Sequence, residues 1–249
     1  EEAAEPLREP DPGLTTRGTA QAEATARLFR CLAEDPTLDP RFRPCRIYVS
    51  GFLRSLQTCR PISEALGLTA KLALDLHEEG GVFEGPRGGR RSDHPARHGL
   101  NAEQMRECLP GVEGLEAVPA GGWWRGGQET AAEACGRAQS CADWLWGLLE
   151  EQEENGEPGA VICISHGLFV DRWIKALVGM PPESEAAMFM TANCAYWLVS
   201  LRLDHKAEQP RQAMMAACNV VDHVPMSVRT GHRIGGHSHC QPSYPRPDR

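Results

Sequence analysis

An apolar run that ends in a histidine and a glycine places the strongest constraint on how this chain folds. Residues 161–167 read Val-Ile-Cys-Ile-Ser-His-Gly, and Gly159 stands just before them. An uninterrupted run of β-branched and apolar residues is typical of a central strand in a parallel sheet. Because open α/β sheets bind their ligands at the carboxyl ends of such strands, His166 is expected to lie in a binding or catalytic site.

A helix over about residues 168–178 is predicted directly behind this strand. Its free backbone N–H groups and its positive dipole end would face an anion beside His166, where a phosphate group would fit. A Ser-His-Gly triplet taken alone has an alternative interpretation. In it, the histidine only ends the strand and forms an ordinary hydrogen bond there.

Strands and helices alternate along the rest of the chain, which predicts parallel strands joined by right-handed crossovers. Thr15 or Thr16 can cap the first helix, and Gly67 can end the second. Residues 77–128 form an insert rich in Gly, Arg and Pro that is expected to cover the active edge of the sheet. The remaining predicted strands are 46–50, 68–76 and, as the last one, 195–203, and the predicted helices are about 16–33, 53–66, 102–108 and 130–154.

Composition indicates one soluble domain. With 249 residues, 41% of them hydrophobic, the chain can bury one sizeable core, which we assign to residues 1–204, and residues 205–249 are predicted to be a partly disordered tail. The net charge of −8 argues against a general nucleic-acid or membrane-surface binder. Ten cysteines without a Cys-x-x-Cys pair indicate a reducing compartment, so a cytoplasmic location is expected. No stretch approaches the ~20 apolar residues that span a bilayer.

Charged residues follow two further strands at the same predicted edge. Arg54 lies in the first helical turn after strand 46–50, where its guanidinium could bind a phosphate. Glu78 and Glu79 follow strand 68–76, and either carboxyl could protonate a leaving oxygen as a general acid. Taken one at a time, an arginine or a pair of glutamates in such places is more often a solvated surface group.

Several segments follow one another in a characteristic order. The first is Leu-Thr-Thr-Arg-Gly-Thr-Ala-Gln-Ala at residues 14–22, and the second is Val-Ser-Gly-Phe-Leu-Arg-Ser-Leu-Gln-Thr-Cys at residues 49–59. After them come Leu76-His77-Glu78, Glu84-Gly85, Ser165-His166-Gly167 and the Asn-Cys-x-x-Trp of residues 193–197. This set resembles the histidine phosphatase superfamily, the clan of phosphoglycerate mutase-like enzymes. That family has the motifs Ser-Ser-Pro-Leu-x-Arg-x-x-x-Thr-Ala and Leu-Thr-x-x-Gly-x-x-Gln-Ala, an acidic loop and a Ser-His-Gly. The resemblance covers about residues 11–204.

The resemblance implies an α/β fold, a three-layer α/β/α sandwich with a mainly parallel sheet. It implies a phosphatase that hydrolyses a phosphomonoester through a phosphohistidine, with a small phosphorylated metabolite or a phosphoprotein as substrate and with no metal or cofactor. By the same resemblance, His166 and Glu78 would be catalytic, and Arg54 and the amide of Gly167 would bind the phosphate. Glu79 stays open as the acid in place of Glu78.

The nucleophile of that family is absent from its expected place. It belongs to an Arg-His-Gly at the end of a first strand, whereas residues 1–13 contain no apolar run and no histidine. An Arg97-His98-Gly99 follows residues that cannot form a buried strand, so we interpret this triplet as a coincidence. Without the first strand, residues 161–164 are expected either to expose an unpaired edge or to pair with strand 195–203.

Three functions therefore stay open. A phosphatase whose intact form includes the nucleophile is the leading hypothesis, although the chain as given is expected not to turn over. A catalytically inactive protein that binds phosphorylated ligands or partners, and a phosphomutase, are the alternatives. In the tail, His232, His237, His239 and Cys240 invite a metal interpretation, but a flexible tail without fixed ligand geometry is the preferred one.

Overall fold

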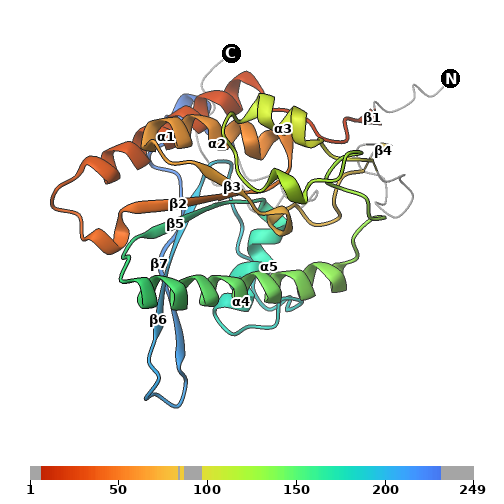
Figure 1. Cartoon of the computed structure of the whole chain (residues 1–249). Coiled ribbons are helices and arrows are strands. Elements are labelled where there is room, and N and C mark those ends of the chain that lie inside the picture. The colour runs from red at the N-terminus through yellow and green to blue at the C-terminus, as the bar shows by residue number, and fades with distance from the viewer. Residues whose placement is uncertain (1–6, 84, 87–96, 231–249) are drawn as a thin grey trace.

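A parallel sheet forms the middle layer of the protein (Figure 1). The computed structural model describes residues 7–83, 85–86 and 97–230. Strand β2 (Pro44–Val49) lies between β3 (Ala70–Leu72) and β5 (Ala160–Ile164), and both pairings are parallel. The mainly parallel α/β architecture expected from the resemblance is therefore confirmed.

Helices cover both faces of this sheet. Figure 1 shows α1 (Thr16–Glu34), α2 (Leu53–Leu66) and α3 (Ala102–Cys108) above it. On the other side lie α4 (Ala131–Asn155) and α5 (Gly167–Leu177). These layers complete an α/β/α sandwich, with the carboxyl ends of β2 and β5 leading into α2 and α5.

Local signals set the ends of these helices, and the ends of α1 and α2 are as predicted. The Thr15 hydroxyl accepts a hydrogen bond from Gly18 N and caps α1. Gly67 ends α2 with a φ of 63°, a left-handed conformation that favours glycine. At α4, Thr130 and Glu133 form a reciprocal capping box.

Two strand predictions were wrong. The segment 68–76 contains only the short strand β3, because Ala73 leaves the strand conformation and Leu74–Leu76 forms a 3-10 turn. The strand predicted at 195–203, observed as β6 (Tyr196–Leu203), is not the last one. It pairs antiparallel with β7 (Arg211–Val220), inside the segment interpreted as a tail. Residues 1–14, predicted as loop, include β1 (Leu7–Arg8), which pairs with β4 (Gly85–Pro86).

The edge of β5 opposite β2 pairs with no other described strand. Among the described residues, β5 bonds only to β2, and β6 bonds only to β7. Four of the five β5 residues are only half-buried, although the strand is entirely apolar. Of the two arrangements expected for residues 161–164, the structure shows the unpaired edge.

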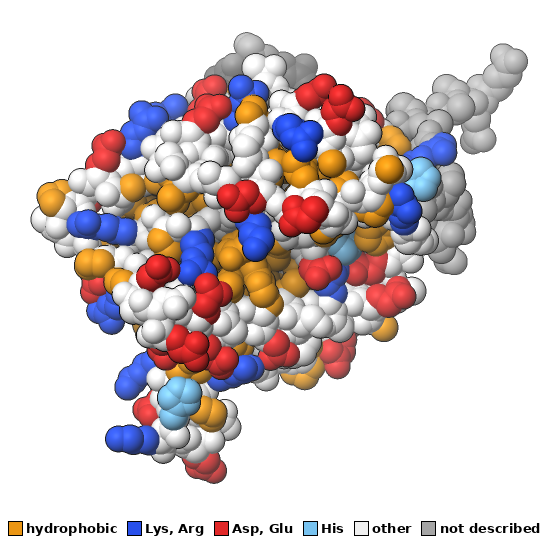
Figure 2. Space-filling model, viewed as in Figure 1, with side chains coloured by type: hydrophobic (Ala, Val, Ile, Leu, Met, Phe, Trp, Pro, Cys, Tyr) orange, Lys and Arg blue, Asp and Glu red, His pale blue; other side chains and the backbone are white. Residues whose placement is uncertain are grey.

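Alternation along β2 divides the core between the two faces of the sheet. Ile47 and Val49 face the α2 side, and Tyr48 faces α4 and α5. Figure 2 shows charged side chains of both signs spread over one face of the molecule, with hydrophobic side chains between them. No helix in the described residues is long and apolar enough to cross a membrane. All nine cysteines within the described ranges are free thiols.

Candidate active site

His166 follows β5 and is the N-cap residue of α5, at the carboxyl edge of the sheet. The side chain is buried, and the residue is 7% exposed. Its Nε2 lies 2.8 Å from Ser50 Oγ, just past β2, and 3.1 Å from Ser55 Oγ in the first turn of α2. Residues from two neighbouring strand ends therefore meet at one imidazole nitrogen, and Gly167 follows as the first residue of α5.

The surroundings of His166 favour a neutral ring. Burial lowers the pKa of His166 well below its ordinary value of 6.5, and the positive charges of Arg54 and Arg137 lower it further. An anion bound beside the ring would act in the opposite direction and favour the imidazolium.

Arg54 lies at the same edge through its contact with Phe52. Its guanidinium carbon is 4.2 Å from the centroid of the Phe52 ring, and that ring lies 4.8 Å from the imidazole of His166. Arg54 Nη1 is also 3.8 Å from Asp11 Oδ1. Both carboxylate oxygens of Asp11 accept from Leu53 N at 3.1 Å, so this aspartate caps α2 and stands beside the arginine.

Glu78 and Glu79 have different surroundings. Glu78 Oε1 accepts from the amide of Phe169, in the first turn of α5, at 3.2 Å and from Glu79 N at 3.0 Å. Glu79 instead forms a two-pronged ion pair with Arg172, with distances of 2.7 and 3.1 Å. The carboxyl of Glu78 thus lies at the start of the helix that follows His166, whereas that of Glu79 is held on a later turn.

Sequence reasoning missed the two serines that contact His166. Ser50 stands inside a quoted motif, but nothing local shows that its hydroxyl points to a residue 116 positions away. A serine in a first helical turn, such as Ser55, is ordinarily interpreted as satisfying the helix end. The buried Arg137 was missed as well, because a single arginine in a long surface helix resembles a solvated one.

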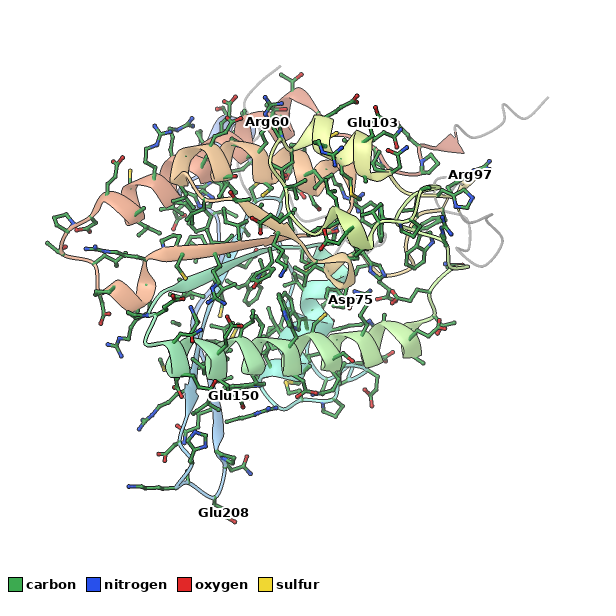
Figure 3. The ribbon with its side chains drawn as sticks, in the orientation of Figure 1. Arg60, Asp75, Arg97, Glu103, Glu150 and Glu208 are labelled. Atoms are coloured by element: carbon green, nitrogen blue, oxygen red, sulfur yellow. The ribbon has the colours of Figure 1, made fainter. Side chains whose placement is uncertain are left out.

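The Arg97-His98-Gly99 triplet lies in the insert and follows no strand of the parallel sheet. Arg97 N donates to Val82 O, and His98 Nδ1 lies 3.3 Å from Trp124 O. Both residues are exposed, and Figure 3 shows Arg97 at the margin of the molecule. Glu84 and the histidines and cysteine of the tail lie outside the described residues.

The described part of the chain contains no group of three or more His, Cys, Asp or Glu side chains that could hold a metal ion. An arginine, a buried histidine and the N-terminus of α5 lie at the sheet edge, and groups of these kinds suit an anion. The Glu78 carboxyl adjoins them at the start of α5.

Comparisons with known proteins agree with this fold. The sequence profile of the histidine phosphatase superfamily (branch 1) matches residues 4–210. The chain matches no curated protein. The solved complex of mycobacterial glucosyl-3-phosphoglycerate phosphatase with inorganic phosphate is 21% identical, with a TM-score of 0.53, over 86% of this chain and 91% of that one. The structure of mycobacterial hydrolase 2 is 18% identical, with a TM-score of 0.53, over 84% of this chain and 80% of that one.

Proposed function

We propose that this chain, which belongs to the histidine phosphatase superfamily, serves as a phosphatase that hydrolyses a phosphomonoester through a phosphohistidine. The observation that carries the proposal is the position of His166, buried at the end of β5, at the start of α5 and in ring contact with the residue that supports Arg54. Similar solved structures include a phosphatase bound to inorganic phosphate.

Each residue then has a role that its surroundings support. Arg54 and the amide of Gly167 bind the equatorial oxygens of the phosphoryl group, and His166 becomes imidazolium and stabilises their charge. Glu78 gives a proton to the leaving oxygen as the ester P–O bond breaks, while a second histidine nitrogen forms the new P–N bond. Water then attacks phosphorus and gives a proton to the Glu78 carboxylate, the P–N bond breaks, and inorganic phosphate leaves.

The second histidine is the point on which the proposal depends. Among the described histidines, His77 lies near His166 but is enclosed by Trp123 and Trp124, and its Nδ1 is 2.9 Å from Leu74 O. His98 and His205 are exposed, in the insert and after β6, and His223 lies against α1, with its Nε2 3.1 Å from Thr25 Oγ1. We therefore propose that the nucleophile comes from outside the described residues.

The open edge of β5 favours a second candidate function. A site that binds phosphate but has no histidine opposite His166 would make the protein an inactive binder of phosphorylated ligands or partners. A small phosphorylated metabolite or a phosphoprotein is the proposed ligand in either case. We also propose a cytoplasmic location, because free thiols at all nine described cysteines suit a reducing compartment.

Turnover of an aryl phosphate tests the enzyme proposal. The 249-residue chain is compared with a form extended at its N-terminus by an apolar strand that ends in Arg-His-Gly, and acid-labile phosphoprotein is trapped on each. We expect turnover and trapped phosphate only in the extended form, and a loss of about a hundredfold or more in its His166→Ala variant. Turnover by the short chain that disappears with His98→Ala would show that the triplet in the insert is the nucleophile.

Calorimetric titration with inorganic phosphate tests the binding half of the proposal on the chain as it is. We expect binding that weakens by about tenfold or more in Arg54→Ala, because a charge-assisted hydrogen bond is lost. Arg46→Ala, an ion-paired arginine on β2, is the matched control and should bind phosphate unchanged. Equal binding by the parent and Arg54→Ala would reject the assigned phosphate site.

A further inference from the structure

A buried arginine on α4 that sequence reasoning missed, Arg137, forms four hydrogen bonds close to the candidate site. Arg137 donates from Nε to Glu129 Oε1 and from Nη2 to Glu129 Oε2, both at 2.7 Å. The two side chains are 9% and 7% exposed. Two parallel bonds between these groups fix the direction of the guanidinium plane.

The remaining nitrogen of this guanidinium holds the loop that carries Glu78. Arg137 Nη1 donates to Asp75 O at 2.5 Å and to His77 O at 3.0 Å. Figure 3 shows Asp75 close to α4. On the other side of Glu78, Gly80 N donates to Glu129 Oε2 at 3.3 Å. The ion pair therefore holds the backbone both before and after Glu78.

The same arginine contacts the residue that receives the Glu78 carboxyl. The guanidinium carbon of Arg137 lies 3.8 Å from the centroid of the Phe169 ring. The amide of Phe169 is the donor that Glu78 Oε1 accepts at 3.2 Å. Arg137 thus contacts the backbone of His77, next to Glu78, and the ring of Phe169, whose amide bonds to the Glu78 carboxyl.

We infer that Arg137, oriented by Glu129, is a positioning residue that holds the Glu78 carboxyl against the N-terminus of α5. This inference rests on the proposed function, in which Glu78 is the general acid. Ser165 supports the same loop, since its Oγ donates to Leu76 O at 2.8 Å, but it reaches only the backbone before Glu78. The position of the acid then depends on a residue that need not touch substrate.

Hydrogen exchange in the 249-residue chain tests whether Arg137 holds the Glu78 carboxyl against the Phe169 amide. The variant is Arg137→Met with Glu129→Gln, which removes both charges and leaves no buried ion unpaired. We expect the Phe169 amide to exchange at least about tenfold faster, because it loses the Glu78 acceptor. The Val170 amide, which bonds to His166 O, should be unchanged and so reports that α5 stays folded. Unchanged exchange at Phe169 would overturn the inference.

Leaving-group dependence tests whether the contact positions an acid. In the form of the protein that turns over, kcat for phenyl phosphate should fall by about tenfold or more in the double variant, because a poor leaving group needs the proton. For dinitrophenyl phosphate, a good leaving group, kcat should change by less than about threefold. Arg46→Met removes an ion-paired arginine elsewhere and should change neither rate. Equal losses on both esters would overturn the inference, because they would show a general structural role.

The hydrogen-exchange and leaving-group experiments together separate this inference from the proposed function. If no form of the protein hydrolyses either ester, the proposed function fails, and exchange at Phe169 still decides whether Arg137 holds the loop. If both esters are hydrolysed and Phe169 is unaffected, the function stands and the role of Arg137 is rejected.

Discussion

Removal of the Glu129 charge should destabilise the protein strongly, and the structure sets the size of the effect. Hydrogen bonds and charge interactions with Arg137 and His77 outweigh the burial of Glu129 and lower its pKa from 4.5 to about 2. A pKa lowered by this amount on folding corresponds to about 3 kcal/mol of folding free energy near neutral pH. Glu129→Gln should lose about that amount, because it leaves the buried Arg137 without its partner.

The sign of the pH dependence follows from a pKa that is lowered on folding. The contribution of Glu129 is fully present above its unfolded pKa of about 4.5 and is lost as the pH falls toward about 2, where the folded group also protonates. Urea unfolding of the parent and of Glu129→Gln at a series of pH values measures the difference. The difference should be largest near neutral pH and shrink through this acid range.

An exposed carboxyl provides the control. Asp39 also has a pKa of about 2, held down by hydrogen bonds from Arg41, but this pair lies in solvent. Asp39→Asn should therefore leave unfolding almost unchanged, because water screens the pair. A Glu129→Gln variant as stable as the parent at neutral pH, or a difference that does not depend on pH, would refute the reasoning about the buried pair.

Three further outcomes can be measured on the same chain. Gly99→Ala should lower stability by about 1–3 kcal/mol in denaturant unfolding, because a Cβ there would overlap the Trp123 indole. Lys175→Met should cost roughly 3–5 kcal/mol by the same measurement, because it leaves the largely buried Asp171 without its ion-pair partner at 2.7 Å. In a thiol-labelling time course, the exposed thiols should react first, and the buried thiols whose pKa burial raises to about 12 should react only on unfolding. The first group is Cys31 and Cys218, and the second is Cys59 and Cys141.

Local chemistry explains which elements could be predicted from the sequence. The limits of α2 follow from a short-range pattern and from Gly67, which supplies the left-handed conformation at its end. The start of α4 follows from the capping residues Thr130 and Glu133. By contrast, β7 is rich in Ala and Met, which lack the β-branched character of typical strands, and only its pairing with β6 makes it a strand.

The sequence allowed only one prediction about the candidate site, that its residues follow the ends of neighbouring strands. Arg54, Glu78 and His166 each follow a strand, and parallel strands bring their carboxyl ends to one edge. Which groups then touch one another depends on packing between distant segments. The contact of His166 with Ser50 spans 116 positions, and the bond from Arg137 to the carbonyl of His77 spans 60. No local pattern encodes separations of this kind.

Charge balance links these long-range contacts to the chemistry of the edge. Arg54 faces the Asp11 carboxylate, and Arg137 is matched by Glu129, so neither cation stands alone in the protein. Burial and the neighbouring positive charges lower the pKa of His166 and so favour its neutral ring. In the proposed function, the positive charge at a bound phosphate would come partly from a proton taken up by His166 on binding and partly from the N-terminus of α5. A bound dianion would thus create the imidazolium that stabilises it, which makes the buried and neutral state of His166 compatible with a role in phosphoryl transfer.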